Sequence, residues 1–309
     1  MNGIVKLILV STILLACTYD KVPKRKYITE NVILLVIDGP RYSETFGDSL
    51  HTNIPEQYAL LNECLFVKEC YNLGETFTVP GHNALISGFY ENIANNGSEY
   101  PAHESVINYW LLHTSFTSND ASIIASKDKL QVLAGNSVEL NKKPFTDCGI
   151  SGLGSGYRTD SITHLHVMNR LQSSTQRCML INYLGPDVKG HLGDSIAYLN
   201  AIKETDLYVK QIWSFIQIDV RYKDKTTLIV TNDHGRHING VSNGFISHGD
   251  NCSGCRRIQL QIFSPDVQKG TTCYTAYDQL NIAATIAELL QIPEFNSENG
   301  LTPMSAIFK

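Results

Sequence analysis

The sequence predicts an α/β fold, in which helices cover both faces of a doubly wound and mainly parallel sheet. Three observations support this prediction. Apolar runs of strand length recur along the chain, segments with helical periodicity lie between them, and polar residues follow directly where the runs end. The 309 residues allow one large domain of this class or two small ones, and the composition is that of an ordinary globular protein.

The strands are predicted where apolar residues continue without interruption. Residues 31–37 are apolar after Asn31, which is typical of a strand buried on both faces of a parallel sheet. Similar runs predict further strands over residues 121–126, 178–184, 225–231 and 258–263.

Helices are predicted between these strands, where apolar residues recur every three to four positions. In residues 195–216, Ile196, Leu199 and Ile202 begin such a series. Residues 142–157 contain Gly and Pro and are predicted to be irregular. The predicted helices cover residues 105–113, 162–172, 195–216 and 277–292, and a further helix opens at residues 83–88.

Residues 1–16 have the features of an export signal. Lys6 supplies a positive charge, an apolar core follows, and the segment is too short for a typical membrane span. Residues 14–17 (Leu-Leu-Ala-Cys) resemble a bacterial lipobox, so we expect cleavage before Cys17 and lipidation of this residue. A plain cleaved signal peptide and an uncleaved anchor are the alternatives. Residues 17–30 would then form a tether, and the protein would be a periplasmic or cell-surface lipoprotein attached to the membrane by its lipid.

Charge and cysteine content narrow the possible functions. The formal net charge is −5 and no Lys/Arg run is interleaved with aromatic residues, so nucleic-acid binding is not expected. Among the cysteines, Cys252 and Cys255 form a Cys-x-x-Cys pair, which is compatible with a local disulfide, half of a metal site or a redox pair. We favour the disulfide, because a lone pair of this kind is a weak zinc signal and export permits disulfides.

Residues 74–82 (Gly-Glu-Thr-Phe-Thr-Val-Pro-Gly-His) place the Thr78 hydroxyl on a constrained turn before a predicted helix. Such a turn directs backbone N–H groups and the positive end of the helix dipole toward one point, which suits an anion. A Thr hydroxyl is a weak nucleophile at neutral pH and needs a metal ion or a base to activate it. Taken alone, the turn is better explained as a capped loop, so its interpretation depends on metal ligands elsewhere.

Asp and His residues follow three of the predicted strands. Mixed carboxylate and imidazole sets suit zinc, although Mn²⁺ or Mg²⁺ at one position is also compatible with them. Two ions about 4 Å apart can clamp the attacking and leaving oxygens of a displacement. The residues in question are Asp38, Asp187, His191, Asp233, His234 and His248.

Five short motifs in this order resemble the alkaline phosphatase superfamily. The nucleotide pyrophosphatase/phosphodiesterase-like and single-Thr phosphatase branches are most similar, and phosphonoacetate hydrolase is also similar. The resemblance extends over residues 31–292 and implies an alkaline phosphatase-like catalytic domain over 31–309, with small cap insertions at about 92–120 and 141–172. The motifs are I-D-G at 37–39, T-V-P-G-H at 78–82, P-D-x-x-G-H at 186–191, N-D-H-G at 232–235 and S-H-G at 247–249.

The resemblance also implies roles for individual residues. Thr78 would be the nucleophile that becomes phosphorylated, and an Asn in the loop after its helix would hold a phosphoryl oxygen. Asn96 is the candidate for that Asn, and Asn95 is the next choice. One zinc ion would be held by Asp38, Asp233 and His234 with the Thr78 oxygen, and a second zinc ion by Asp187, His191 and His248. No metal role is expected for the remaining candidates His82, His103 and His237.

Two lysines refine the expected substrate. Lys127 and Lys129 follow a predicted strand and resemble the paired basic residues that monoester phosphatases of this type place over the terminal substrate oxygens. Two cations would neutralise the extra charge of a phosphate monoester, which a diester lacks. A sulfatase is disfavoured, because sulfatases need a Cys/Ser-x-Pro-x-Arg motif, and Thr78 and His82 occupy its first and last positions here.

We therefore expect a di-zinc phosphohydrolase that cleaves phosphate monoesters through a phospho-Thr78 intermediate. A phosphodiesterase or nucleotide pyrophosphatase and a phosphonate hydrolase are the enzymatic alternatives on the same site. The alternative from another class is a noncatalytic surface lipoprotein that binds a phosphorylated ligand. The expected partner is a small phosphorylated substrate.

Overall fold

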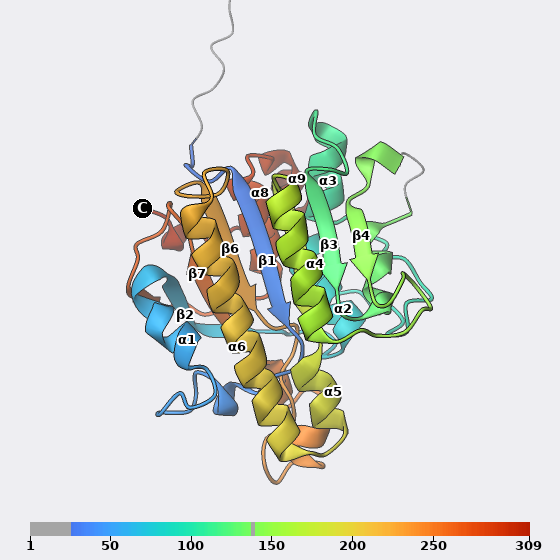
Figure 1. Cartoon of the computed structure of the whole chain (residues 1–309), viewed down its shortest axis with the longest axis vertical. Helices are drawn as coiled ribbons and strands as arrows, with labels where there is room; N and C mark the ends of the chain where they lie inside the picture. Colours follow the sequence, from blue (N-terminus) through green and yellow to red (C-terminus); the bar gives the residue numbers. More distant parts are fainter. Residues whose placement is uncertain (1–25, 137–139) are drawn as a thin grey trace, which may run out of the picture.

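A computed structural model describes residues 26–136 and 140–309, and these form a single sheet covered by helices on both faces (Figure 1). The predicted fold class is therefore confirmed. The predicted export signal, Cys17 and residues 17–25 of the tether lie outside the described residues.

The strand order is β4-β3-β5-β1-β6-β7-β2-β8, and β9 also pairs with β2. The central strand β1 pairs in parallel with β5 on one side and β6 on the other. Among the described strands, β7 departs from this pattern, because it pairs antiparallel with both β6 and β2. The strands are β1 (Asn31–Ile37), β2 (Leu65–Tyr71), β3 (Ala121–Ala125), β4 (Phe145–Cys148), β5 (Cys178–Tyr183), β6 (Thr226–Thr231), β7 (Arg257–Phe263), β8 (Thr271–Cys273) and β9 (Tyr277–Asp278).

Two hydrophobic cores lie on opposite faces of the sheet, because successive side chains of a strand point to opposite faces. In β1, Ile33 and Leu35 pack toward α4 and α6, whereas Val32 and Leu34 pack toward α2, α3 and α8 (Figure 1). The helices are α1 (Pro55–Ala59), α2 (Thr78–Ser87), α3 (Val106–His113), α4 (Asp160–Ser173), α5 (Gly185–His191), α6 (Ser195–Ile218), α7 (Ser253–Arg256), α8 (Leu280–Leu289) and α9 (Pro293–Asn299).

Some elements differ from the prediction. Phe145–Cys148 form the edge strand β4 within the segment expected to be irregular, and this strand has no continuous apolar run because only Cys148 is fully buried. The predicted helix over 277–292 is shorter, since Tyr277–Asp278 pair with β2 before α8 begins. Helix α2 begins earlier than expected, at Thr78, because Pro80 is tolerated in the first turn of a helix.

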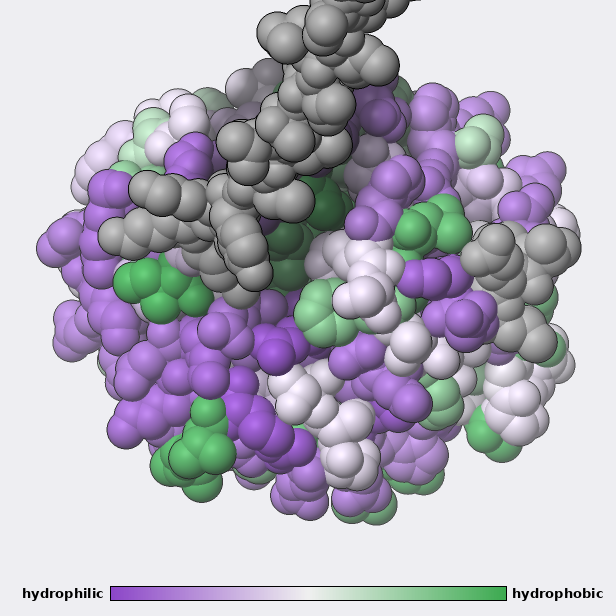
Figure 2. Space-filling model, turned by 90° about the horizontal axis from the view of Figure 1, so that it is seen from above, coloured by the Kyte–Doolittle hydropathy of each residue, from purple (hydrophilic) through white to green (hydrophobic). Residues whose placement is uncertain are grey.

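The carboxyl ends of β1, β3, β5 and β6 meet at one edge of the sheet, at the bottom of Figure 1. The described chain enters β1 at the opposite edge, and that face is hydrophilic over most of its visible area (Figure 2). None of the described helices combines the length and the apolar character needed to cross a bilayer.

The buried carboxylate of Asp160 holds the start of α5 at the carboxyl ends of β3 and β5. Asp160 accepts hydrogen bonds from the backbone N–H groups of Leu184 and Gly185, at 2.8 and 2.7 Å, and from the Ser126 hydroxyl at 2.6 Å. It therefore ties the ends of β3 and β5 to α4, and burial raises its pKa to about 6.

We expect Asp160→Ala to lower the free energy of unfolding by about 1–3 kcal/mol, because it leaves buried N–H groups without an acceptor. Urea denaturation measures this change. Ser161→Ala, at the exposed neighbouring position, is the control and should have little effect. An Asp160→Ala protein as stable as the control would show that these hydrogen bonds do not hold α5.

Candidate two-metal site

The polar residues at the carboxyl ends of the strands surround a cavity of about 420 Å³. It is lined by residues at the N-terminus of α2, in the loop after α2, in the segment after β3 and in helix α5. The lining includes Thr78, Asn95, Lys127, Lys129, Tyr157 and His191. This position agrees with the rule that open α/β sheets bind ligands at the carboxyl ends of their strands.

Thr78 is the first residue of α2, and it is buried. Its Oγ1 accepts a hydrogen bond of 2.9 Å from Lys127 Nζ. The same nitrogen lies 2.9 Å from Asp38 Oδ2 and 2.6 Å from Asp187 Oδ2. The hydroxyl of Thr78 therefore adjoins one carboxylate of each expected metal site.

The first expected ligand set, Asp38, Asp233 and His234, converges on one point. His234 Nε2 lies 3.6 Å from Asp38 Oδ1 and 3.4 Å from Asp233 Oδ2. These three atoms are buried, and none of them has a hydrogen-bond partner among the described residues. Buried polar atoms without partners are rare in proteins, so this cluster fits a cation that accepts all three as ligands.

Hydrogen bonds made by the other side-chain atoms of these residues orient their ligand atoms toward the cluster. His234 Nδ1 donates to the Gly235 carbonyl at 2.9 Å, which directs Nε2 toward the cluster. Asp233 Oδ1 accepts from the backbone N–H groups of Gly39 and His234, whereas Oδ2 faces the cluster and also lies 3.2 Å from His82 Nδ1. Outer contacts of this kind orient metal ligands in proteins.

The second expected set also comes together. His191 Nε2 and His248 Nε2 each lie 3.2 Å from Asp187 Oδ1 and 3.0 Å from one another. His248 Nδ1 donates to the Thr76 carbonyl at 2.7 Å, so its Nε2 is again the free nitrogen. Ligand atoms of Asp187, His234 and His248 lie within 4.8 Å of one another, and the two sets therefore adjoin.

Burial and neighbouring charges set the protonation of these groups. Burial lowers the pKa of His234 to about 3, which keeps its ring neutral and able to bind a cation. Burial alone would raise the pKa of Asp233, but His234 and His82 outweigh it and lower the pKa to about 2. Burial and the Asp233 charge raise the pKa of Asp38 to about 6. For Asp187, burial is opposed and exceeded by Lys127, which holds the pKa well below its usual range.

The structure corrects the choice of asparagine. Asn96 is exposed, and its side chain accepts from the Ser98 N–H in a local turn. Asn95 instead lines the cavity, where its Oδ1 accepts from the Val79 N–H of α2 at 2.9 Å. Lys129 Nζ donates to the same Oδ1 at 3.1 Å, so Asn95 links Lys129 to the N-terminus of α2.

Sequence reasoning missed several residues that support the site. Arg236 is fully buried and donates to Asp187 Oδ1 at 2.5 Å, and Asn182 contacts both Asp38 and His82. Arg236 follows the N-D-H-G motif directly, but the motif does not reveal a contact with a residue 49 positions away. The Tyr157 ring lies 5.8 Å from Lys127 Nζ, and no sequence signal marked it.

The other sequence candidates lie as follows. His82 Nδ1 faces the Thr78 carbonyl at 2.9 Å and Asp233 Oδ2 at 3.2 Å, and its Nε2 faces Asn182. Its ring therefore lies beside the first ligand set, within 4.8 Å of ligand atoms of Asp38 and Asp233. His103 is exposed and pairs with Glu91. The expected disulfide between Cys252 and Cys255 is wrong, because both are free thiols in this structure. Their surroundings are described below.

Comparisons with known proteins give one family match and one curated relative. Residues 156–294 match the model of the Metalloenzyme superfamily. A 2,3-bisphosphoglycerate-independent phosphoglycerate mutase of Gracilaria tenuistipitata var. liui is 29% identical over 140 residues, which is 44% of this chain. The match spans only 25% of that enzyme's length.

Solved structures share the fold across most of the chain. A phosphonate monoester hydrolase of Agrobacterium radiobacter has a TM-score of 0.61 and 12% identity, covering 85% of this chain and 74% of that one. A protein in the alkaline phosphatase superfamily from Vibrio parahaemolyticus has a TM-score of 0.60 and 13% identity, covering 85% of this chain and 66% of that one.

We expect His234→Ala to lose about one bound divalent ion per chain, because it removes a neutral ligand from the first set. Elemental analysis of the purified protein after dialysis measures the metal content. His103→Ala removes an exposed histidine distant from the ligand sets and should retain the full content. Equal metal content in both variants would exclude His234 as a ligand.

Proposed function

We propose that the chain is a metalloenzyme of the alkaline phosphatase superfamily and that it hydrolyses phosphate monoesters through a phosphorylated Thr78. One observation supports this proposal most strongly. Lys127 donates a hydrogen bond to the Thr78 oxygen, at the N-terminus of α2. The same ammonium pairs with one carboxylate of each of the two adjoining ligand sets. A nucleophile, a cluster of metal ligands and a cationic cavity therefore occupy one place.

Two divalent ions, which we propose to be zinc, fit the donor sets. The first would be bound by Asp38, Asp233 and His234, and the second by Asp187, His191 and His248. When bound, such ions would lower the pKa of a coordinated hydroxyl and neutralise charge on the leaving oxygen. The unpartnered atoms of the first set are the main support for a cation there.

Lys127 would stabilise the nucleophile without acting as a base. Burial would lower the pKa of its ammonium, but Asp187 and Asp38 outweigh burial and raise the pKa above its usual value. The group therefore remains a donor, and its hydrogen bond to Thr78 Oγ1 favours the alkoxide form of the hydroxyl.

The reaction would proceed in two displacements at phosphorus. The Thr78 oxygen, after its proton has passed to water, would form a bond to phosphorus while the bond to the alcohol oxygen breaks, and the alcohol would take up a proton from water as it leaves. Water would then attack the same phosphorus and give a proton to the Thr78 oxygen as the bond between that oxygen and phosphorus breaks, which restores the hydroxyl and releases inorganic phosphate. The Lys129 side chain lines the space where the phosphoryl oxygens would lie, and its ammonium would stabilise their negative charge.

The relatives support more than one substrate. The name of the phosphoglycerate mutase implies a phosphate monoester, which agrees with the proposal. The name of the phosphonate monoester hydrolase supports the alternative of an ester with a single negative charge. We favour the monoester because two lysines line the cavity, and the diester and phosphonate reactions remain the alternatives for the same site.

The expected lipid anchor at Cys17 stays a proposal. Residues 26–30 enter the sheet at the edge opposite the site (Figure 1). A protein attached to a membrane through this end would therefore direct its cavity away from the bilayer, toward soluble substrates.

Thr78→Ala should lower kcat/KM for an aryl phosphate monoester by about 10³-fold or more, because it removes the proposed nucleophile. Turnover of matched aryl phosphate mono- and diesters by the zinc-loaded protein measures this effect. Thr78→Ser keeps a hydroxyl and should retain part of the activity. Rapid acid quenching of the wild-type reaction with labelled substrate should trap phosphothreonine at position 78.

Several outcomes would contradict this proposal. Diester turnover well above monoester turnover would exclude the monoester assignment while keeping the site. Full activity in Thr78→Ala would exclude the covalent route. Zinc-loaded protein without turnover of any phosphate or phosphonate ester would favour the noncatalytic binding protein.

The two lysines should have separable effects. Lys129 Nζ donates to the carbonyl and Oδ1 of Asn95, and burial together with Lys127 lowers its pKa to about 8. Lys129→Ala should therefore reduce monoester kcat/KM by about 10–100-fold, the value of one charge-assisted hydrogen bond, with a smaller effect on the diester. Lys127→Ala should reduce both reactions, because it contacts the nucleophile.

The pH dependence provides a second measurement for Lys129. The ammonium is present below its pKa and is lost above it, so wild-type monoester kcat/KM should fall as the pH rises through about 8. This fall should be absent from Lys129→Ala. The same fall in the variant would assign the titration to another group.

A further inference from the structure

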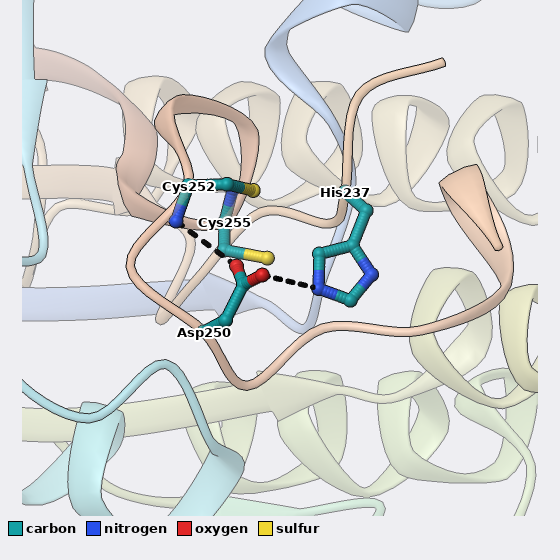
Figure 3. Close-up of side chains that lie close together, drawn as sticks. All are labelled: His237, Asp250, Cys252 and Cys255. Carbon is teal, nitrogen blue, oxygen red and sulfur yellow. Dashed lines mark hydrogen bonds and ion pairs between the residues drawn. The ribbon is translucent and has the colours of Figure 1, made fainter. Parts of the chain in front are cut away.

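Four potential metal ligands meet outside the two sets described above. His237, Asp250, Cys252 and Cys255 each offer one atom, and these atoms all lie within 4.8 Å of one another. All four belong to the segment between β6 and β7, and Figure 3 shows their side chains turned toward a common centre. None of them has a role in the proposed reaction.

The His237 ring is oriented as a metal ligand would be. The residue is buried, and its Nδ1 faces the Ser247 hydroxyl at 3.0 Å. Its Nε2 lies 3.1 Å from Asp250 Oδ2 (Figure 3), yet it makes no hydrogen bond of acceptable geometry with any described residue. His234 has the same pattern, with one nitrogen engaged and a buried Nε2 directed at its ligand set.

The carboxylate and the thiols complete the set. Asp250 Oδ1 accepts from the Cys252 N–H at 2.9 Å, which leaves Oδ2 beside the imidazole. Cys252 Sγ in turn accepts from the Cys255 N–H at 3.4 Å, a contact that stabilises negative charge on sulfur. Cys255 is buried and Cys252 partly buried, and both are free thiols.

The backbone around the four residues is closely packed. The Gly235 N–H donates to the Cys255 carbonyl at 2.8 Å, which joins the segment after β6 to the Cys-x-x-Cys turn. A Cβ atom at Gly254 would lie 2.4 Å from the Arg236 carbonyl oxygen, so only glycine permits this approach. The two parts of the chain that supply the ligands are therefore held together by contacts independent of any ion.

The chemical types of the four ligand atoms favour zinc over other divalent ions. Two thiolates, one imidazole and one carboxylate are a tetrahedral zinc set, because soft sulfur ligands disfavour Mg²⁺ and Ca²⁺. Bond lengths of about 2.0–2.3 Å place the ligand atoms of such a site roughly 3.3–3.8 Å apart. Even the most distant pair allowed by the 4.8 Å limit would need to close by only about 1 Å.

We propose that His237, Asp250, Cys252 and Cys255 form a third, structural Zn²⁺ site. All four positions are filled by the chain, so the site has no vacant position for substrate. Its ligands enclose the segment that carries His248, and the site would fix this segment against the end of β6. This proposal gives His237 a metal role that the sequence did not lead us to expect, and it does not depend on the proposed phosphatase activity.

Cobalt substitution tests the proposal on the full-length protein. The metal is removed with a chelator under reducing conditions and replaced with Co²⁺. We expect a thiolate-to-cobalt charge-transfer band in the near ultraviolet, which oxygen and nitrogen ligands do not produce. The paired change Cys252→Ser with Cys255→Ser should abolish the band and remove one ion per chain.

Control variants separate this site from the other two. Cys273→Ser alters a free cysteine outside the cluster and should keep both the band and the metal content. His234→Ala should lose an ion but keep the band.

The wild-type spectrum alone can overturn the proposal, even if the paired variant fails to fold. A cobalt-loaded wild type without a thiolate band would exclude sulfur ligation. Thiols at Cys252 and Cys255 that react in the unfolded wild type only after addition of reductant would show a disulfide instead. Equal metal content in the paired variant and the wild type would also overturn it.

Discussion

The site depends on three carboxylates buried together at one end of the sheet. Asp38, Asp187 and Asp233 each follow a strand that is buried on both faces, and water has little access to them there. An ionised group in such a place is costly unless cations or donors compensate it. The surrounding side chains are arranged to provide this compensation, and that requirement explains much of the local architecture.

Positive charges of the chain compensate these carboxylates unequally. Asp187 is surrounded by Lys127, Arg236 and two histidines, and its pKa lies well below the usual range although burial opposes this. Asp38 has Lys127 on one oxygen, whereas its other oxygen has no hydrogen-bond partner in the described chain, and its pKa is raised to about 6. The deficit in positive charge therefore lies at the first ligand set, which is where a bound cation would have the largest effect.

Much of the fold follows from local sequence patterns. The buried runs of β1, β5 and β6 could be predicted because a parallel strand covered on both faces needs uninterrupted apolar residues. The edge strand β4 and the two-residue strand β9 could not, because partial exposure allows polar residues and removes the pattern. The antiparallel direction of β7 likewise depends on a chain reversal near Cys252–Cys255 that no periodicity encodes.

The site was predictable to the extent that its residues lie within short motifs. The six proposed ligands and Thr78 all belong to these motifs, and the structure brings them together. Asn95 and Asn96 are neighbours in sequence, and only the turn after α2 decides which one reaches the cavity. Arg236 and His237 could not be assigned, since their partners lie elsewhere in the chain and become neighbours only after folding.

Lys127 and Lys129 illustrate how partners rather than residue type determine chemistry. Lys127 has two carboxylates within 2.9 Å, and they raise its pKa although it is buried. Among the described residues, Lys129 donates to neutral oxygens of Asn95, so burial and the repulsion from Lys127 lower its pKa to about 8. A dianionic ligand would therefore gain more from Lys129, whose charge has no carboxylate beside it, while Lys127 is already paired with Asp38 and Asp187 and donates to Thr78. Of the two lysines, the one with the weaker protein contacts would thus contribute more to binding such a charge.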